Sequence, residues 1–326
     1  MVSPLMLLNI LVVLLGFLLL IKGGDWLVDG SVAIAKRAKL SPMVIGITVI
    51  GFGTSAPELF VSLQAALADS PGISIGNIVG SNIANIGLIL GVTALILPCV
   101  SKAFTLKVDL PMMCAACWLL VGVGMTGTIG RLAGAIGVVT LILFISWEVR
   151  RSRRLTKKAE SNEENTAPVM ALWKAVFLAL FALGLLVGGA NLLVNGAAGI
   201  ARTIGDAVGA DPNDMERIIG LTIVAVGTSF PELFASVIAA RKGQQDMAIG
   251  NIVGSVTFNV LFAIGLPAII CPIHNSDQGF FLDYLLMGGS AILLWFFMFT
   301  RRTLERWEGA ILLFIYIAYI AYTVVA

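Results

Sequence analysis

Two glutamates stand inside long apolar stretches of this sequence, and the same pair of hydroxyl residues precedes each of them. The two sets are Thr54, Ser55 and Glu58, and Thr228, Ser229 and Glu232. Residues three and four apart share one face of a helix, so each carboxylate would have two hydroxyls beside it. A carboxylate at membrane depth is costly and is kept where it has a partner and a function. The duplication therefore indicates one ion site shared by two segments.

A proline precedes each glutamate by one residue. Pro57 and Pro231 have no amide hydrogen, so neither can donate to the carbonyl of the residue four positions earlier, Gly53 or Gly227. We expect both helices to kink there and to free backbone oxygens beside the carboxylates. Such oxygens are tolerated at membrane depth where they line a wet cavity or are buried in protein.

A polar stripe follows in each segment, on an otherwise apolar helix that begins GNIVGS. Its members are spaced by four and are Asn77, Ser81 and Asn85 in the first segment, and Asn251, Ser255 and Asn259 in the second. Gly76 and Gly80 form a GxxxG pair, as do Gly250 and Gly254, which permits close helix approach. Packing accounts for the glycines but not for the asparagines.

Together these residues offer carboxylate, hydroxyl, amide and carbonyl oxygens, without thiolate or imidazole. Such a set suits hard cations, and two negative charges with flexible oxygens suit Ca²⁺ better than Mg²⁺. Na⁺ can occupy the same oxygens. If either ion neutralises the carboxylates, the empty, charged site is a poor state in which to change conformation, and obligatory exchange follows.

The rest of the chain is built to hold this site in a membrane. Of its 326 residues 58% are hydrophobic and 12% are charged, with a mean hydropathy of +0.98. We expect an all-α polytopic membrane protein with about ten transmembrane helices. The expected spans are 5–34, 42–67, 72–97, 105–125, 130–149, 169–201, 217–240, 246–270, 280–300 and 308–325. The net charge of +2 gives no indication of a nucleic-acid partner. No cofactor motif is found.

An internal repeat organises these spans. Residues 44–91 align without a gap to 218–265 at an offset of 174, and about 22 of the 48 positions are identical. We expect two halves, 1–149 and 169–326, joined by a flexible linker at 150–168. Each half holds five spans, an odd number, so the halves must be inverted relative to one another. Inverted repeats are typical of secondary transporters that work by alternating access.

The basic residues set the expected orientation. Sixteen of them, six in the linker, fall in loops on one side, whereas the opposite loops hold only Arg131, Arg202 and Arg217. This bias puts the linker in the cytoplasm and both termini outside. The compact length is typical of a protein of the prokaryotic inner membrane. Asp25 and Asp29 in the first span could line an ion path, but we expect them nearer a membrane interface, hydrogen-bonded to another helix.

The motifs GTSAPE and GNIVGSNIANIG in the first half, and GTSFPE and GNIVGSVTFNV in the second, resemble the calcium/cation antiporter superfamily, in particular its prokaryotic sodium/calcium exchangers of the YrbG-like branch. The resemblance covers the whole chain. It implies exchange of Ca²⁺ for Na⁺, and helices at the start of each half that slide past a fixed core. It implies cation ligands at Thr54, Ser55, Glu58, Ser81, Asn85, Thr228, Ser229, Glu232, Ser255 and Asn259, with backbone oxygens near Gly51 and Ala225.

Three other functions compete with this one. A proton/calcium exchanger could use the same fold by protonating Glu58 and Glu232. A cation channel would have a selectivity-filter loop and weak serial sites, which the sequence lacks. An intramembrane enzyme would need a nucleophile with its base, or a metal motif such as HExxH, and neither occurs. The sequence leaves the oligomeric state open, although a monomer holds a complete site.

Overall fold

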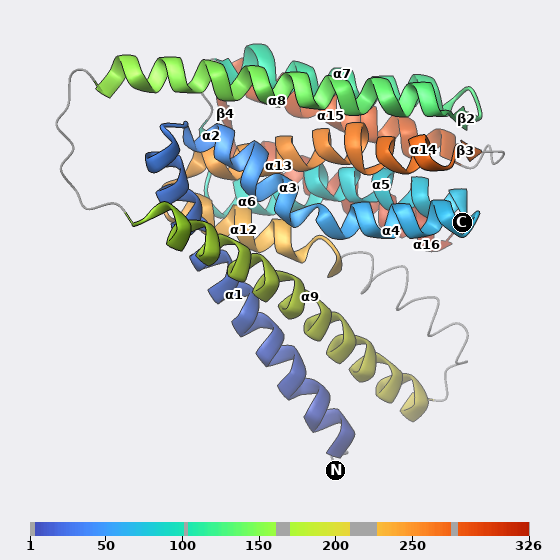
Figure 1. The fold of residues 1–326 in the computed structure, drawn as a ribbon. Helices are drawn as coiled ribbons and strands as arrows, with labels where there is room; N and C mark the ends of the chain where they lie inside the picture. The colour runs from blue at the N-terminus through green and yellow to red at the C-terminus, as the bar shows by residue number, and fades with distance from the viewer. Residues whose placement is uncertain (1–3, 101–103, 161–169, 209–226, 275–279, 326) are drawn as a thin grey trace.

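The computed structural model describes residues 4–100, 104–160, 170–208, 227–274 and 280–325, and these are almost entirely helical (Figure 1). In the first half the elements are α1 (Pro4–Ala38), α2 (Pro42–Ile45), η1 (Gly46–Ile50), α3 (Gly51–Thr54), α4 (Ala56–Leu67), α5 (Pro71–Ala84), η2 (Asn85–Leu90), α6 (Gly91–Ile96), β1 (Cys99–Val100), η3 (Thr105–Asp109), α7 (Leu110–Gly124), β2 (Thr128–Ile129) and α8 (Arg131–Glu160), where η marks a π-helix. In the second half they are α9 (Leu172–Val208), α12 (Phe230–Arg241), α13 (Gln245–Phe258), η5 (Asn259–Ala263), α14 (Gly265–Ile270), β3 (Ile273–His274), α15 (Phe281–Arg301), β4 (Thr303–Leu304) and α16 (Arg306–Val325).

These helices have the length and composition of membrane spans. Within the described residues, seven continuous helical segments are long and apolar enough to cross a bilayer. An eighth span consists of two segments, Pro42–Thr54 and Ala56–Leu67, which meet at a bend of 46°. Apolar residues such as Leu5, Phe177 and Phe314 lie exposed on the outer helices, as expected of side chains that face lipid. The chain is therefore an all-α, multi-pass membrane protein.

The two halves repeat one another element by element. Each of α4, α5, η2, α6 and β1 has a counterpart that begins 174 residues later, and these counterparts are α12, α13, η5, α14 and β3. The expected repeat is thus visible in local structure, down to a π-helix that begins at Asn85 in one half and at Asn259 in the other. Both π-helices lie where an α-helix is interrupted inside the bundle, a location in which π-helical turns are frequently functional.

Two short antiparallel ladders join the halves. β1 pairs with β4, with Cys99 opposite Leu304, and β2 pairs with β3, with Ile129 opposite Ile273. Figure 1 shows β4 at one end of the bundle and the β2–β3 pair at the other. Because β1 and β3 are repeat equivalents, the two ladders are images of one another, as inverted halves require.

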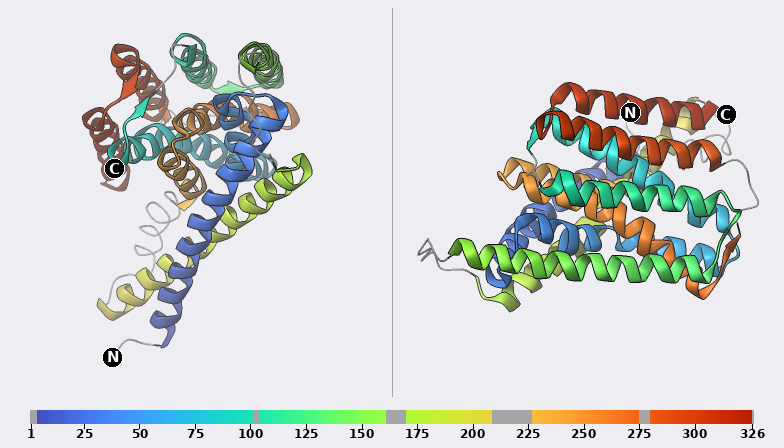
Figure 2. Two further views of the ribbon diagram at one scale, coloured as in Figure 1. Left: turned by 90° about the vertical axis from the view of Figure 1, so that its left-hand side faces the viewer. Right: turned by 90° about the horizontal axis from the view of Figure 1, so that it is seen from above.

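The long helices α1 and α9 form a separate antiparallel pair that leans away from the remaining bundle (Figure 1 and Figure 2). They touch along glycines: a Cβ on Gly16 would lie 2.8 Å from the carbonyl oxygen of Gly189, and one on Gly23 would lie 3.0 Å from that of Ala182. A smaller hydrophobic cluster, which contains residues of α1, α9 and α12, connects the pair to α12. The larger core surrounds α5 and α13, which are the most deeply buried spans.

An ionic contact ties α1 to the end of α12. The Lys242 Nζ lies 2.8 Å from the Asp29 Oδ1 and 3.3 Å from the Asp25 Oδ1, and it also donates to the Asp25 carbonyl at 3.0 Å. The two aspartates therefore bond to another helix, as the sequence predicts. Their carboxylates are at least a third exposed, so this contact lies near a wet surface.

One expectation about the linker is wrong. The segment 150–168 is predicted to be irregular from Arg150 onward, but α8 continues through it to Glu160. The basic residues there extend the helix because Arg and Lys have high helix propensity and the preceding span has already nucleated the helix. Residues 161–169 and much of the expected span 217–240 lie outside the described residues.

Candidate cation site

The glutamates lie at the first turn of a helix that starts after a break. In the first half, α3 ends at Thr54, Ser55 has φ −87° and ψ 3°, and α4 begins at Ala56 with Glu58 in its first turn. In the second half, Ser229 has φ −90° and ψ 2° before α12, whose first turn holds Glu232. The expected kink is confirmed by the 46° bend in the first half. A helix N-terminus also favours a negative charge or an anion.

Glycines bring the first broken helix against α13 of the other half. A Cβ on Gly51 would lie 2.9 Å from the amide nitrogen of Ser255, and one on Gly254 would lie 2.5 Å from the carbonyl oxygen of Ile47. Backbones can approach so closely only where no side chain intervenes. Across this contact, the Ser255 hydroxyl donates to the Gly51 carbonyl at 3.3 Å and lies 3.5 Å from the Thr54 hydroxyl.

Two asparagines hold the glutamate-bearing helices in the same way in each half. The Asn77 side-chain amide donates to the Glu58 carbonyl at 3.0 Å and to the Ser62 hydroxyl at 2.9 Å. Its repeat equivalent, Asn251, donates to the Glu232 carbonyl at 3.3 Å and to the Ser236 hydroxyl at 2.8 Å. The Asn251 side-chain oxygen is also 3.4 Å from the Thr54 hydroxyl, so it connects the two halves.

Buried oxygens without hydrogen-bond partners gather around these helix starts. Glu58 and Glu232 are 2% and 1% exposed. Within the described part of the chain, the unpartnered oxygens here are Ser55 Oγ, Glu58 Oε2, Asn85 Oδ1, Ser229 Oγ, both carboxylate oxygens of Glu232 and Asn259 Oδ1. Buried polar atoms are normally satisfied, so unpartnered oxygens on facing elements need an explanation. A cation among them would supply one.

The remaining expected ligands differ in position. Packing of α4 against η5 and of α12 against η2 brings each glutamate helix against the π-helix of the other half, so Asn259 and Asn85 start the elements that face the carboxylates. Ser81 is buried on α5, and Thr228 is partly buried at the break before α12. Ala225 lies outside the described residues.

Sequence reasoning left some polar residues of this region unassigned. Ser62 and Ser236 accept the asparagine bonds, and Asn82 accepts a bond of 3.1 Å from the Asn259 amide. The first two are identical at the repeat offset of 174, which is the signal that could have identified them. Asn82 has no such signal, because Val256 stands at its repeat position.

A small cavity reaches the break from the side of α9. It measures about 130 Å³ and is lined by Pro57, Gly227, Thr228 and Pro231 together with Val187, Ala190, Asn191 and Val194 of α9. The residues that shape both helix breaks thus share a cavity with a helix of the leaning α1–α9 pair. Movement of that pair would change access to this cavity.

The oxygen set also restricts the chemistry. Among the described residues, no group of three or more His, Cys, Asp or Glu side chains is placed to hold a metal ion. Any cation here would instead be held by two carboxylates supplemented by hydroxyl, amide and carbonyl oxygens. Such ligands suit Ca²⁺ and other hard cations and are unsuited to soft transition metals.

The sequence model of the family described as sodium/calcium exchanger protein matches this chain twice, at residues 8–149 and 174–325. The chain belongs to this family. CaxA of Alkalimonas amylolytica is 36% identical over 96% of this chain and 98% of its own length. The inner membrane protein YrbG of Escherichia coli is 34% identical over 86% of each chain. A solved structure of the sodium-calcium exchanger NCX_Mj superimposes with a TM-score of 0.81 at 31% identity, over 97% of this chain and 99% of that one.

Membership of the sodium/calcium exchanger family decides between the functional classes left open by the sequence. The chain is a secondary transporter of the calcium/cation antiporter superfamily, not an enzyme. One family model matches each half separately, in agreement with the duplication at the offset of 174. The relatives span the chain almost from end to end, so the similarity is not confined to the short duplicated motifs.

Proposed function

We propose that this protein exchanges Ca²⁺ for Na⁺ by alternating access, at a site that lies between Glu58 and Glu232 near the middle of the membrane. The observation that carries the proposal is the group of buried, unpartnered oxygens on and around two buried carboxylates. One Ca²⁺, or Na⁺ ions in its place, would compensate their charge. The name of NCX_Mj as a sodium-calcium exchanger supports Na⁺ rather than H⁺ as the coupling ion.

The proposed ligands are those that the family resemblance implies. Glu58 and Glu232 supply the charge, and hydroxyl and amide oxygens complete the shell; these are Thr54, Ser55, Ser81, Asn85, Thr228, Ser229, Ser255 and Asn259, with backbone oxygens near Gly51 and Ala225. The only partners required are the two ions and the lipid bilayer, without a cofactor. We place the protein in the inner membrane with residues 150–168 in the cytoplasm and both termini outside.

Transport in proteoliposomes tests this function. Vesicles loaded with NaCl are diluted into sodium-free buffer that contains ⁴⁵Ca²⁺, and wild type is compared with Glu58→Gln and Glu232→Gln. We expect sodium-dependent uptake in wild type and background uptake in both variants, because each substitution removes one of two charges that must balance Ca²⁺. Asp69→Asn is the matched control, since it neutralises an exposed carboxylate and should transport normally.

The competing outcomes are distinguishable in the same vesicles. Uptake driven by an inward-acid pH step without Na⁺, and lost in both glutamine variants, would make the protein a proton/calcium exchanger with the same site. Uptake that depends neither on the two gradients nor on the two glutamates would refute the proposed site. Reconstitution of each variant is checked by size-exclusion chromatography before uptake is measured.

A further inference from the structure

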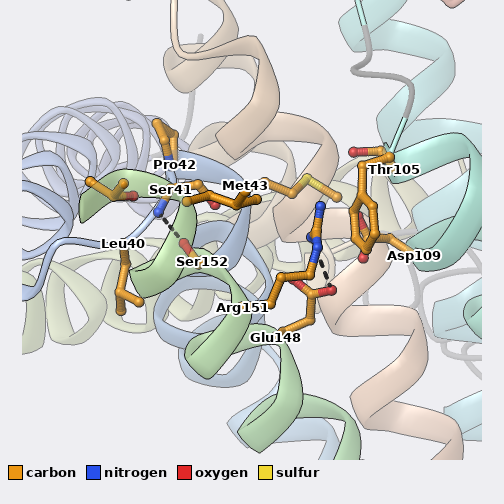
Figure 3. A pocket seen from close by; sticks show the side chains of 12 residues that line it. Leu40, Ser41, Pro42, Met43, Thr105, Asp109, Glu148, Arg151 and Ser152 are labelled. Carbon is orange, nitrogen blue, oxygen red and sulfur yellow. Dashed lines mark hydrogen bonds and ion pairs between the residues drawn. The ribbon is translucent and has the colours of Figure 1, made fainter. Parts of the chain in front are cut away.

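The polar cavity at the end of the bundle where α1 joins α2 holds a cluster that its own members balance (Figure 3). The Asp109 and Glu148 carboxyls lie within hydrogen-bond reach of one another, and Thr105 bonds Asp109. One shared proton, together with the Arg151 Nη1 at 3.6 Å from the Glu148 Oε1, balances the charge of the pair. The side-chain oxygen of Asn259, at the start of η5, is a buried polar atom that its neighbours do not balance.

Asn259 uses one end of its side-chain amide within the described part of the chain. Its Nδ2 donates to the Asn82 Oδ1 at 3.1 Å, whereas its own Oδ1 has no hydrogen-bond partner there. Both asparagines are fully buried, so bulk water does not reach this oxygen. Buried polar groups are normally satisfied, and the free end of this amide is its acceptor.

Asn82, on α5, holds the Asn259 amide in one of its two orientations. A side-chain amide has a donor end and an acceptor end. Because Asn82 presents its oxygen, Asn259 must turn its NH₂ group toward Asn82 and its own oxygen away from it. The reverse orientation of Asn259 would bring two oxygens together and would leave its NH₂ group at the free end.

The orientation of Asn82 is in turn determined by Met287 on α15. The Asn82 Nδ2 donates to the Met287 Sδ at 3.6 Å. A thioether sulfur accepts a hydrogen bond but has no hydrogen to donate, so the NH₂ end of Asn82 belongs on this side. Met287 is fully buried as well, and solvent therefore does not compete. Two successive hydrogen bonds thus run from η5 through α5 to α15 in one direction.

We propose that Asn82 is a specificity-determining positioning residue, which together with Met287 makes Asn259 present its carbonyl oxygen, and not its NH₂ group, to the transported cation. The inference rests on the proposed function, in which Asn259 is a ligand. An amide oxygen is a ligand for hard cations such as Ca²⁺, whereas an NH₂ group in its place would repel them. Loss of a group that orients a metal ligand typically weakens metal binding roughly 10–100-fold.

This arrangement serves one of the two amides. Val256 stands at the repeat position of Asn82, and a valine side chain has no hydrogen-bonding group. The equivalent amide of the first half, Asn85, therefore has no counterpart of Asn82 to orient it. The two amides of the proposed site are thus positioned by different means.

Equilibrium binding of ⁴⁵Ca²⁺ to the purified protein in sodium-free buffer tests the orientation. Asn82→Val removes the acceptor and introduces the residue of the other copy. We expect the Kd for Ca²⁺ to rise about tenfold, because the freed amide can turn its NH₂ group toward the ion. Displacement of ⁴⁵Ca²⁺ by NaCl should reveal a smaller loss for Na⁺, about threefold, since the energy of an ion near an amide dipole scales with the charge of the ion.

Three further variants separate orientation from packing. Met287→Leu conserves volume and removes the acceptor for Asn82, so the Kd should rise by a smaller factor. In an Asn259→Asp background both ends of the side chain are oxygens, and Asn82→Val should no longer raise the Kd. Thr257→Val is the matched control, because its buried hydroxyl bonds the Val253 carbonyl of its own helix at 2.7 Å. It should bind Ca²⁺ as the wild type does.

An unchanged Kd in Asn82→Val would overturn the inference. So would a rise that persists in the Asn259→Asp background, which would mean that Asn82 acts through packing. If Asn82→Val fails to fold, as judged by size-exclusion chromatography, an unchanged Kd in Met287→Leu has the same meaning.

Glu58→Gln and Glu232→Gln are measured in the same binding assay. If they abolish binding while Asn82→Val and Met287→Leu leave it unchanged, this inference fails and the proposed function stands. If they leave Ca²⁺ binding intact, the proposed site itself is wrong, and the role of Asn82 fails with it.

Discussion

Asn77 and Asn251 act on the glutamates through the backbone rather than through the carboxylates. Each donates to the glutamate carbonyl and to a serine hydroxyl one turn later. Both bonds join the helix that carries the glutamate to the next helix of the same half. We infer that the asparagines are positioning residues. Each fixes the first turn of the helix that carries a glutamate, and thereby the place of its carboxylate.

The prediction at this scale concerns Asn77. Asn77→Ala removes both donors, and the loss of about 1.4 kcal/mol per positioned glutamate would raise the KM for Ca²⁺ by about tenfold, with a smaller effect on the maximal rate. Uptake assayed over a range of Ca²⁺ concentrations measures this. Because Asn77 bonds Ser62, Ser62→Ala and the double variant complete a cycle that should be non-additive. Strict additivity, or loss of rate without change in KM, would contradict the positioning role.

Sequence predicts the charged part of the site far better than its support. Glu58 and Glu232 stand out because a carboxylate in an apolar run is costly and because it is duplicated. The asparagine donors are different, because an amide in a helix has no fixed partner until the helices pack. Their stripe is visible in the sequence, but only the structure shows that Asn77 and Asn251 face the adjacent helix.

At the scale of elements, the crossing of the first broken helix and α13 depends on the absence of side chains. A Cβ on Gly254 would lie within 2.6 Å of two Ile47 backbone atoms, and backbone cannot move aside as a side chain can. This contact is what allows Ser255 and Gly51 to meet. The glycines of the second GNIVGS, Gly250 and Gly254, are therefore required for this crossing, whereas a Cβ on Gly80 of the first copy would meet nothing within 4 Å.

We accordingly expect Gly254→Ala to destabilise the protein by about 1–3 kcal/mol, the usual cost of overpacking, and to reduce Ca²⁺-dependent stabilisation. Thermal unfolding with and without CaCl₂ measures both quantities. Gly122→Ala is the matched control, since nothing lies within 4 Å of a Cβ there and alanine has the higher helix propensity. Equal melting temperatures for the two variants would show that the crossing tolerates a side chain.

The elements that sequence does not predict are the irregular ones. The π-helices differ from α-helix by a single inserted residue, which leaves no periodic signal in an apolar run. The two-residue strands are too short for an alternating pattern and form only because inverted halves bring their loops together. The extension of α8 to Glu160 is missed for another reason. A basic, polar segment suggests a linker, although its residues favour helix.

For the whole molecule, the proposed topology of inverted halves with five spans each would place both termini on the side opposite the linker. In Figure 1 the facing ends of α8 and α9 lie at the left, whereas both chain termini lie farther right. We expect a membrane-impermeant maleimide to label Leu5→Cys in intact cells and Arg153→Cys only after permeabilisation. Both cysteine variants are made in a protein whose four native cysteines, three of them buried, have been replaced. The reverse pattern would invert the proposed orientation while leaving the fold unchanged.

The ionic contact of Lys242 with Asp25 and Asp29 makes the two halves unequal. At the offset of 174 Lys242 corresponds to Ala68. The helices that start the two halves align at an offset of 166, at which Asp25 and Asp29 correspond to Asn191 and Asn195 on α9, so the mirrored position holds no ion pair. An exposed pair contributes roughly 0.2–1 kcal/mol, and 1 kcal/mol is about a fivefold difference in population. If α1 moves relative to α12, only one of the two open forms retains this contact. The unloaded carrier would then spend more time open to one side than to the other, even when no ion gradient is applied.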